Sequence, residues 1–276
     1  MDSSTKAWRA KGSDFMTTER PVRSRERLWS RTAMVRPVSV GALLAGGLLY
    51  NAWVLELFVP TPLDPRHAYI SELYAEGQPY RGLFAALEMA GAACVLVAAA
   101  GARSCLPRPS LWAWRCGWWM LAGFALSCIA DVLLPMACAP SLDAACHPVH
   151  PAHTVTSALS HFFLYASISS HTWAARQQRG QRIDPVGGWG VWLLPATLLS
   201  ALLTVGPLLG FPGWHGLPQR AHVMLAGTWL IVLAVHLATH PAITSARQLP
   251  LQPGRQGQRP TPARREDHRQ RRKVVR

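Results

Sequence analysis

The sequence predicts an all-α polytopic membrane protein, a bundle of six transmembrane helices with both termini in the cytoplasm. Half of its 276 residues are hydrophobic, they fall into six long blocks, and the basic residues lie almost entirely between alternate blocks. A helix needs about 20 apolar residues to cross about 30 Å of hydrocarbon. The alternative, a soluble helical bundle, would have shorter helices with a polar face, which most of these blocks lack. The blocks are residues 38–59, 81–102, 116–136, 153–174, 189–211 and 221–243.

The placement of basic residues predicts the topology. If the amino terminus is cytoplasmic, 25 of the 28 Lys and Arg residues fall on the inner side, and only Arg66, Arg81 and Arg220 fall outside. Such a bias is the positive-inside pattern of membrane proteins. The first block is too long for a signal-peptide core and is not followed by a cleavage motif, so it is expected to be retained as a helix.

The chain divides into a helical domain and two basic tails. Residues 37–244 are expected to form the six-helix domain, and the tails, residues 1–36 and 245–276, have little to bury and are expected to be disordered. Tails of this charge beside a bilayer are expected to bind anionic lipid headgroups. The segment "RREDHRQRRKVVR" leaves nucleic acid as an alternative partner, but none is expected, and the oligomeric state is not predicted.

Two of the six cysteines share one outer loop. Cys138 and Cys146 flank the short segment "CAPSLDAAC", whereas the other four lie within helices or at the cytoplasmic face. Disulfides form in an oxidising exterior and not in the cytoplasm. We therefore predict a Cys138–Cys146 disulfide that constrains the loop before the fourth helix.

Ionisable residues within spans are candidate functional residues, because an unpaired charge in the bilayer is costly. Those expected in the outer half of the bundle, with polar residues of the outer loops, suggest a vestibule that opens outward. The alternative is that these groups pair with one another and only fix helix packing. Arg81 and Arg220 each begin a helix, where the helix dipole disfavours a cation, so each implies a carboxylate partner or a bound anion. The candidates are Glu56, Ser71, Glu72, Arg81, Glu88, Asp131, His150, His153, Arg220 and His222.

The segment "DAACHPVHPAH" places three histidines just before the fourth block. Pro151 suits the first turn of a helix, so helix four is expected to begin there. His153, Ser157, Ser160 and His161 then form a polar stripe at spacings of three and four. We expect His150 and His153 to meet Asp131, with Arg81 or Arg220 as its positive partner. The same three residues are the candidate ligands if a metal binds; no cofactor is predicted, with zinc as the alternative.

Three segments carry a family resemblance: "YISELYAEGQPYRGLF", "DVLLPMACAPSLDAAC" and "GLPQRAHVMLAGTWL". Together they resemble the bacterial integral membrane family called domain of unknown function 998. The resemblance implies a six-helix protein of the bacterial plasma membrane with no assigned activity. The expected function is transport, ligand binding or sensing at the outer leaflet.

The alternative function is a metal-dependent hydrolase that acts on lipid or envelope headgroups. The "HLATH" motif (His236, His240) resembles the zinc-binding pair of alkaline ceramidases and adiponectin-type receptors, with Ser71 and Asp131 as further members of that site. However, the two histidines lie about 21 and 27 Å inward from His222 along their helix, whereas Ser71 and Asp131 are expected near the outer face. A hydrolase would therefore have to use the outer histidines.

Overall fold

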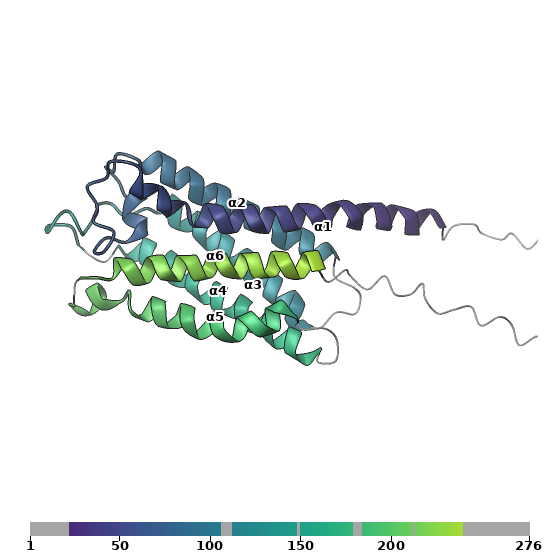
Figure 1. The fold of residues 1–276 in the computed structure, drawn as a ribbon. Coiled ribbons are helices and arrows are strands. Elements are labelled where there is room, and N and C mark those ends of the chain that lie inside the picture. The colour runs from purple at the N-terminus through teal and green to yellow at the C-terminus, as the bar shows by residue number, and fades with distance from the viewer. Residues whose placement is uncertain (1–21, 106–111, 148–149, 179–183, 212, 240–276) are drawn as a thin grey trace, which may run out of the picture. The chain divides into compact units, whose positions relative to one another are not determined.

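Six long helices and three short 3₁₀ segments make up the described part of the chain in the computed structural model (Figure 1). The structure describes residues 22–105, 112–147, 150–178, 184–211 and 213–239. The elements are α1 (Val22–Tyr50), η1 (Ala52–Leu57), η2 (Ile70–Tyr74), α2 (Arg81–Cys105), α3 (Trp112–Leu133), α4 (Pro151–Gln177), α5 (Pro185–Leu202), η3 (Gly206–Leu209) and α6 (Gly216–Thr239). The described residues contain no strand, so the prediction of an all-α protein is confirmed.

The helices form a closed up-and-down ring. Each long helix packs on the next along the chain, and α6 returns to pack on α1 (Figure 1). Glycines allow the closest approaches: a Cβ on Gly46 of α1 would meet Val95 of α2 at 2.9 Å, and one on Gly47 would meet the Gly227 carbonyl of α6 at 3.1 Å. Arg36 also joins α1 to α6. It donates from Nε to the Leu237 carbonyl at 2.6 Å and from Nη2 to the Ala238 carbonyl at 2.8 Å. These carbonyls at the end of α6 lack partners within their own helix.

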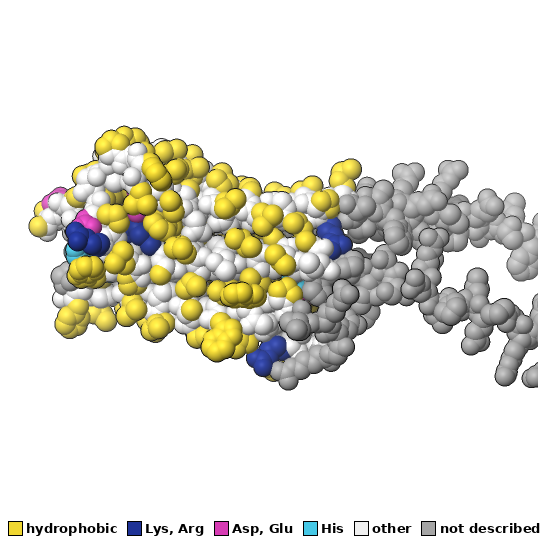
Figure 2. Space-filling view, in the orientation of Figure 1, with side chains coloured by type: hydrophobic (Ala, Val, Ile, Leu, Met, Phe, Trp, Pro, Cys, Tyr) yellow, Lys and Arg dark blue, Asp and Glu magenta, His cyan; other side chains and the backbone are white. Residues whose placement is uncertain are grey.

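Apolar side chains fill the interior of the ring and also cover much of its visible outer face (Figure 2). Trp118, Trp229 and Leu121 are fully buried, whereas Leu48, Phe162 and Trp192 are exposed. Four helices (α2, α3, α5 and α6) are long and apolar enough to cross a membrane, and α1 contributes a shorter apolar stretch, Met34–Tyr50. An apolar exterior over helices of this length is that of a membrane protein.

Several predicted boundaries were wrong. The block 38–59 is not one helix, because α1 ends at Tyr50 and the chain continues through η1. The block 189–211 likewise splits into α5, which ends at Leu202, and η3. Residues 22–36 were expected in a disordered tail but belong to α1; they include several arginines, which are good helix formers. Residues 1–21 and the tail 245–276 lie outside the described residues.

Candidate functional site

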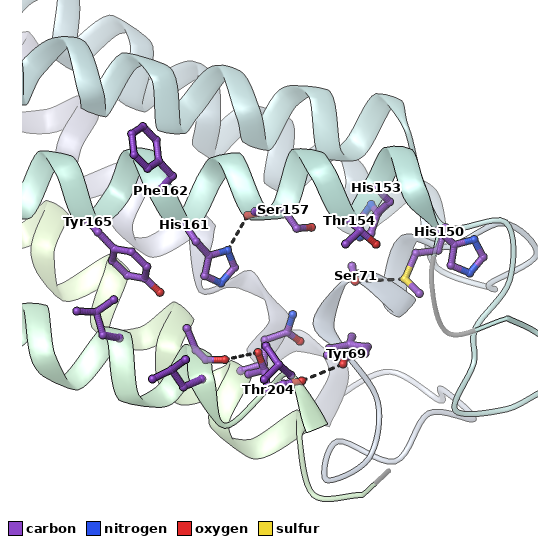
Figure 3. A pocket seen from close by; sticks show the side chains of 17 residues that line it. Tyr69, Ser71, His150, His153, Thr154, Ser157, His161, Phe162, Tyr165 and Thr204 are labelled. Atoms are coloured by element: carbon purple, nitrogen blue, oxygen red, sulfur yellow. Dashed lines mark hydrogen bonds between the residues drawn. The ribbon is translucent and has the colours of Figure 1, made fainter. Parts of the chain in front are cut away.

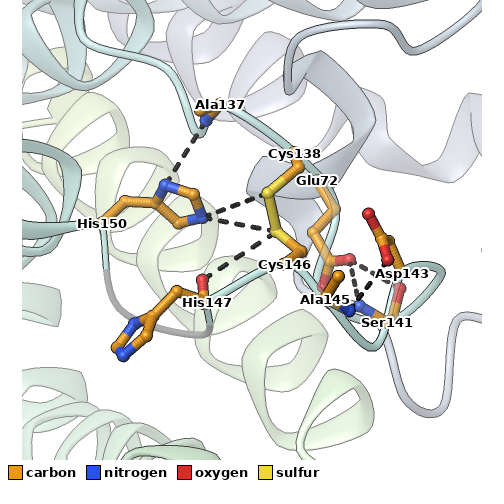
Figure 4. The surroundings of a disulfide bond; sticks show 9 residues. All are labelled: Glu72, Ala137, Cys138, Ser141, Asp143, Ala145, Cys146, His147 and His150. Atoms are coloured by element: carbon orange, nitrogen blue, oxygen red, sulfur yellow. Dashed lines mark hydrogen bonds between the residues drawn. A yellow bond between two sulfur atoms is a disulfide. The ribbon is translucent and has the colours of Figure 1, made fainter.

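The segment between α1 and α2 and the loop between α3 and α4 cover one end of the ring, called the disulfide end below. The Cys138–Cys146 disulfide closes the second loop with a Cα–Cα distance of 6.0 Å, so this prediction is confirmed (Figure 4). Glu72 of η2 joins the two loops: its carboxylate accepts from the Tyr69 amide at 2.8 Å, the Ser141 amide at 3.0 Å and the Ser141 hydroxyl at 2.5 Å. Since the fully buried Glu72 already holds three donors, it ties the loops together and does not line a vestibule.

Arg220 has a carboxylate partner, as its place in the first turns of α6 predicts, but that partner is Glu56. Two parallel bonds join them, Nε to Oε1 and Nη2 to Oε2, each 2.6 Å long. The remaining guanidinium nitrogen, Nη1, donates to the carbonyls of Pro65, Ala68 and Gly216 at 2.7–3.0 Å. Arg81 is exposed at the start of α2. Of the two arginines predicted as the positive partner of Asp131, Arg220 is therefore excluded, because its guanidinium is paired with Glu56.

Asp131, near the end of α3, is held by α4 and by η2. Its Oδ1 accepts from Thr156 at 2.5 Å and Ser157 at 2.8 Å, and its Oδ2 accepts from Tyr74 at 3.0 Å. His153 Nδ1 lies 3.4 Å from Oδ1, which confirms the expected proximity of Asp131 and His153. Burial and the nearby Asp131 carboxylate raise the pKa of Tyr74 well above its ordinary value, so its hydroxyl remains a donor.

A cavity of about 490 Å³ lies between α4 and α5 at the disulfide end (Figure 3). From α4 it takes His153, Ser157 and His161 at its polar side and Phe162 and Tyr165 further along the helix. From the covering loops it takes Tyr69, Ser71, Met136 and His150; from α5 and the chain after it come Leu198, Ala201, Leu202, Thr204 and Val205, and from α6 Gln219. Of the ten predicted site residues, only Ser71, His150 and His153 line it.

The other predicted residues are not part of the cavity lining, and two of them contact residues near it. Glu88 of α2 lies beside the Cys128 thiol of α3, close enough to Asp131 to interact with its charge. His222 of α6 stacks on the cavity residue His161, with ring centroids 4.5 Å apart and planes 16° from parallel. Its Nδ1 lies 3.1 Å from the Thr197 carbonyl, which fixes its ring against α5.

His150 faces the disulfide (Figure 4). Its Nδ1 accepts from the Ala137 amide at 3.4 Å, and its Nε2 lies 3.7 Å from Cys146 Sγ and 4.0 Å from Cys138 Sγ. Within the described residues, the one group of three metal-ligand types with close donor atoms is Cys138, Cys146 and His150, and its two sulfurs are joined in the disulfide. The expected trio of His150, His153 and Asp131 does not converge in this way; of the three, His153 and Asp131 lie close together.

A scan against family models matches residues 43–236 to the family described as "Protein of unknown function (DUF998)". The chain belongs to this DUF998 family. The match confirms the resemblance carried by the three quoted segments, and it covers every residue that lines the cavity. No curated protein and no solved structure matches this DUF998 chain significantly.

Ser157 and His161, which the sequence placed on one polar stripe with His153, also line the cavity of this DUF998 protein. The cavity also includes residues that the sequence did not indicate. Tyr69 and Gln219 left no such signal, because they come from a loop and a different helix. Burial, and then the Glu72 charge, raise the pKa of Tyr69 to about 12, so its hydroxyl is uncharged at neutral pH.

His236, the first histidine of the "HLATH" motif, lies far from the cavity. His236 stacks on Trp114 at 4.6 Å between ring centroids, and its Nδ1 lies 3.0 Å from the Asp184 carboxylate, near the opposite end of the bundle. His240 lies outside the described residues. His236 is therefore not part of a site with Ser71 and Asp131.

Proposed function

We propose that this DUF998 protein is a six-span protein of the bacterial plasma membrane that binds an amphipathic ligand from the outer leaflet, for transport or sensing. The observation that carries the proposal is the cavity between α4 and α5. His150, His153 and Ser157 lie at its disulfide end, whereas Phe162 lies further along α4, and Leu198 and Leu202 of α5 add apolar lining. Concave sites with an apolar lining and a few polar groups are typical of small-molecule binding.

The cavity is also accessible from the side of the bundle. Phe162 is 59% exposed and Leu202 is 66% exposed, although both line it. In a bilayer these side chains would face lipid tails, so an apolar chain could enter between α4 and α5 without crossing water. This supports entry from the membrane rather than from the aqueous phase.

The proposed topology has six spans, both termini in the cytoplasm and the disulfide end outside. The positive-inside bias supports this orientation, and a disulfide is more stable on that side of a plasma membrane. Helix α4 is less apolar than the four clear spans because it carries the polar stripe of His153, Ser157 and His161, but it packs between α3 and α5 in the ring. The tails would bind anionic lipid at the inner face.

Two measurements test the proposal. A reporter active only outside the cytoplasm should be inactive when fused after residue 276 and active when inserted after Asp143 in the disulfide loop; the reverse pattern would refute the topology. For the ligand, protein extracted with its native lipids should retain an amphiphile that Ala158→Trp, which fills the cavity, excludes. As the control, Ala221→Trp adds the same side chain at an exposed position of α6 outside the cavity.

A metal-dependent hydrolase is the second candidate. The observation that favours it is the pairing of His153 with Asp131, because a carboxylate-oriented histidine in a cavity can serve as a base or a ligand. Zinc bound in stoichiometric amount to purified protein, and lost in His153→Gln, would favour this candidate. Protein free of metal that still binds an amphiphile would favour the first.

A further inference from the structure

The cavity has no permanently charged side chain in its lining. None of the side chains that line it is a Lys, Arg, Asp or Glu. Two charged groups beside it already have partners in the protein: Arg220 pairs with Glu56, and Asp131 accepts from the hydroxyls of Tyr74, Thr156 and Ser157. Recognition in the cavity therefore depends on neutral hydrogen-bonding groups, and the protein's own bonds determine whether each acts as a donor or an acceptor.

The two histidines on the α4 side of the cavity are acceptors. His153 Nδ1 faces two acceptors, the Leu134 carbonyl at 3.2 Å and Asp131 Oδ1 at 3.4 Å. His161 Nδ1 lies 2.6 Å from the Ser157 carbonyl. A neutral imidazole has one proton, and in both rings these contacts place it on Nδ1. Each Nε2 then has a free lone pair, and neither has a partner within the described residues.

Most hydroxyl groups of the cavity already donate their hydrogen to another group of the protein. Ser157 donates to Asp131, Tyr69 donates to the Thr204 carbonyl at 2.9 Å, and Ser71 donates to the Met136 sulfur at 3.3 Å. A hydroxyl has one hydrogen to donate, so these oxygens can only accept from a ligand. The lining groups still free to donate are the Thr154 hydroxyl and the amide of Gln219, whose Oε1 is held by the Ile70 amide at 2.6 Å.

The excess of acceptors disfavours an anionic headgroup, and the absence of a lining carboxylate disfavours a cationic one. A phosphate or carboxylate accepts hydrogen bonds and needs several donors or a cation, which the lining does not supply. A quaternary or primary amine would bring an unpaired charge into an apolar cavity that has no lining carboxylate. A headgroup whose hydroxyls donate satisfies the lone pairs. The acceptors of His153 and His161 start about 12 Å apart along α4, so one hydroxyl cannot serve both.

We propose that the cavity binds an uncharged amphiphile whose headgroup carries several hydroxyls, as in a glycosyl or glyceryl lipid, and that these donate to His153 and His161 Nε2. This inference rests on the proposed function, since it names the ligand class of the same site. It replaces the bound anion that Arg81 and Arg220 suggested from the sequence.

Three probes with similar chains separate the classes. The full-length protein is placed in phosphatidylcholine nanodiscs without glycoside detergent and labelled with a diazirine-bearing decyl glucoside, and labelled peptides are assigned by mass spectrometry. We expect labelling of α4 and α5, and competition by decyl glucoside at least tenfold better than by decyl phosphate or methyl decanoate. If decyl phosphate or methyl decanoate competes as well as decyl glucoside does, the inference about the headgroup is overturned and the proposed function stands. Failure to label the cavity with any of three corresponding diazirine probes would overturn both.

Variants at His161 test the acceptor directly. His161→Phe keeps a ring to stack on His222 but removes the lone pair, and should weaken decyl glucoside binding about tenfold, which corresponds to about 1.4 kcal/mol. His161→Gln supplies an amide oxygen and should stay within about threefold of the parent. Thr228→Val, at a half-buried position of α6 outside the cavity, should bind as the parent does. A His161→Phe protein that folds and binds with parental affinity would overturn the assignment.

Discussion

Breaking the Glu56–Arg220 pair should destabilise the whole bundle. The Glu56 side chain is 0% exposed and that of Arg220 is 5% exposed, so neither charge can turn to water. Glu56→Gln leaves a buried guanidinium without its anion, and removing one partner of such a pair costs about 3–5 kcal/mol. For a chain of this size, 1 kcal/mol corresponds to about 2–4 °C in melting temperature, so a decrease of about 6–20 °C is expected.

The assay is the thermal or denaturant unfolding of purified protein in one fixed detergent. The double variant, Glu56→Gln with Arg220→Gln, leaves no unpaired charge and should recover at least half of the lost stability. Arg66→Gln provides the matched control. Arg66 also pairs with a carboxylate, Asp64, at 2.7 Å, but both side chains are largely exposed, so its loss should hardly change the melting temperature. If Glu56→Gln has the same melting temperature as the parent, the Glu56–Arg220 pair does not stabilise the contact between η1 and α6.

Three further predictions concern the disulfide end. Asp131→Asn should lower the stability by about 2–4 kcal/mol in the same assay, because three hydroxyls lose an ionised acceptor; an unchanged melting temperature would contradict this. Cys138 and Cys146 should resist alkylation until reductant is added, and Cys138→Ser should cost about 2–3 kcal/mol for a loop this short; alkylation of both thiols in untreated membranes would argue against the bond. Because the pKa of Tyr69 is raised from about 10 to about 12, stability should fall as pH rises through that interval, and less in Tyr69→Phe; identical alkaline profiles would exclude the effect.

The sequence predicted which segments are helical better than it predicted where each helix ends. Apolar blocks correspond to five of the six helices along most of their length, because the bilayer and the core both require apolar residues. The segment 51–59 is as apolar as the helix before it, yet it turns away as η1. Its Glu56 bonds Arg220, a partner 164 residues later in the chain, and no local pattern records that contact.

The candidate site was predictable where one helix carries it. Spacings of three and four on α4 placed His153 beside Asp131 of the neighbouring helix and put His161 on the same stripe. Glu72 could not be assigned in this way: its partner Ser141 lies in a loop whose path depends on the disulfide. The absence of Lys, Arg, Asp and Glu from the cavity lining could not be predicted from the sequence either, because it depends on which carboxylate each arginine pairs with in the folded protein.

The closure of the ring by α6 has a consequence for biogenesis. In the proposed six-span topology, α1 and η1 are made first, but the partners of their side chains, the guanidinium that pairs with Glu56 and the carbonyls that accept from Arg36, are made only with the last helix. A nascent chain that has inserted α1 to α5 therefore holds a carboxylate without its cation and an open seam between α1 and α5. Assembly of the bundle is thus completed after translation of α6 rather than helix by helix. A chain truncated before Gly216 should be held by membrane chaperones or degraded by membrane proteases, whichever helices it has already inserted.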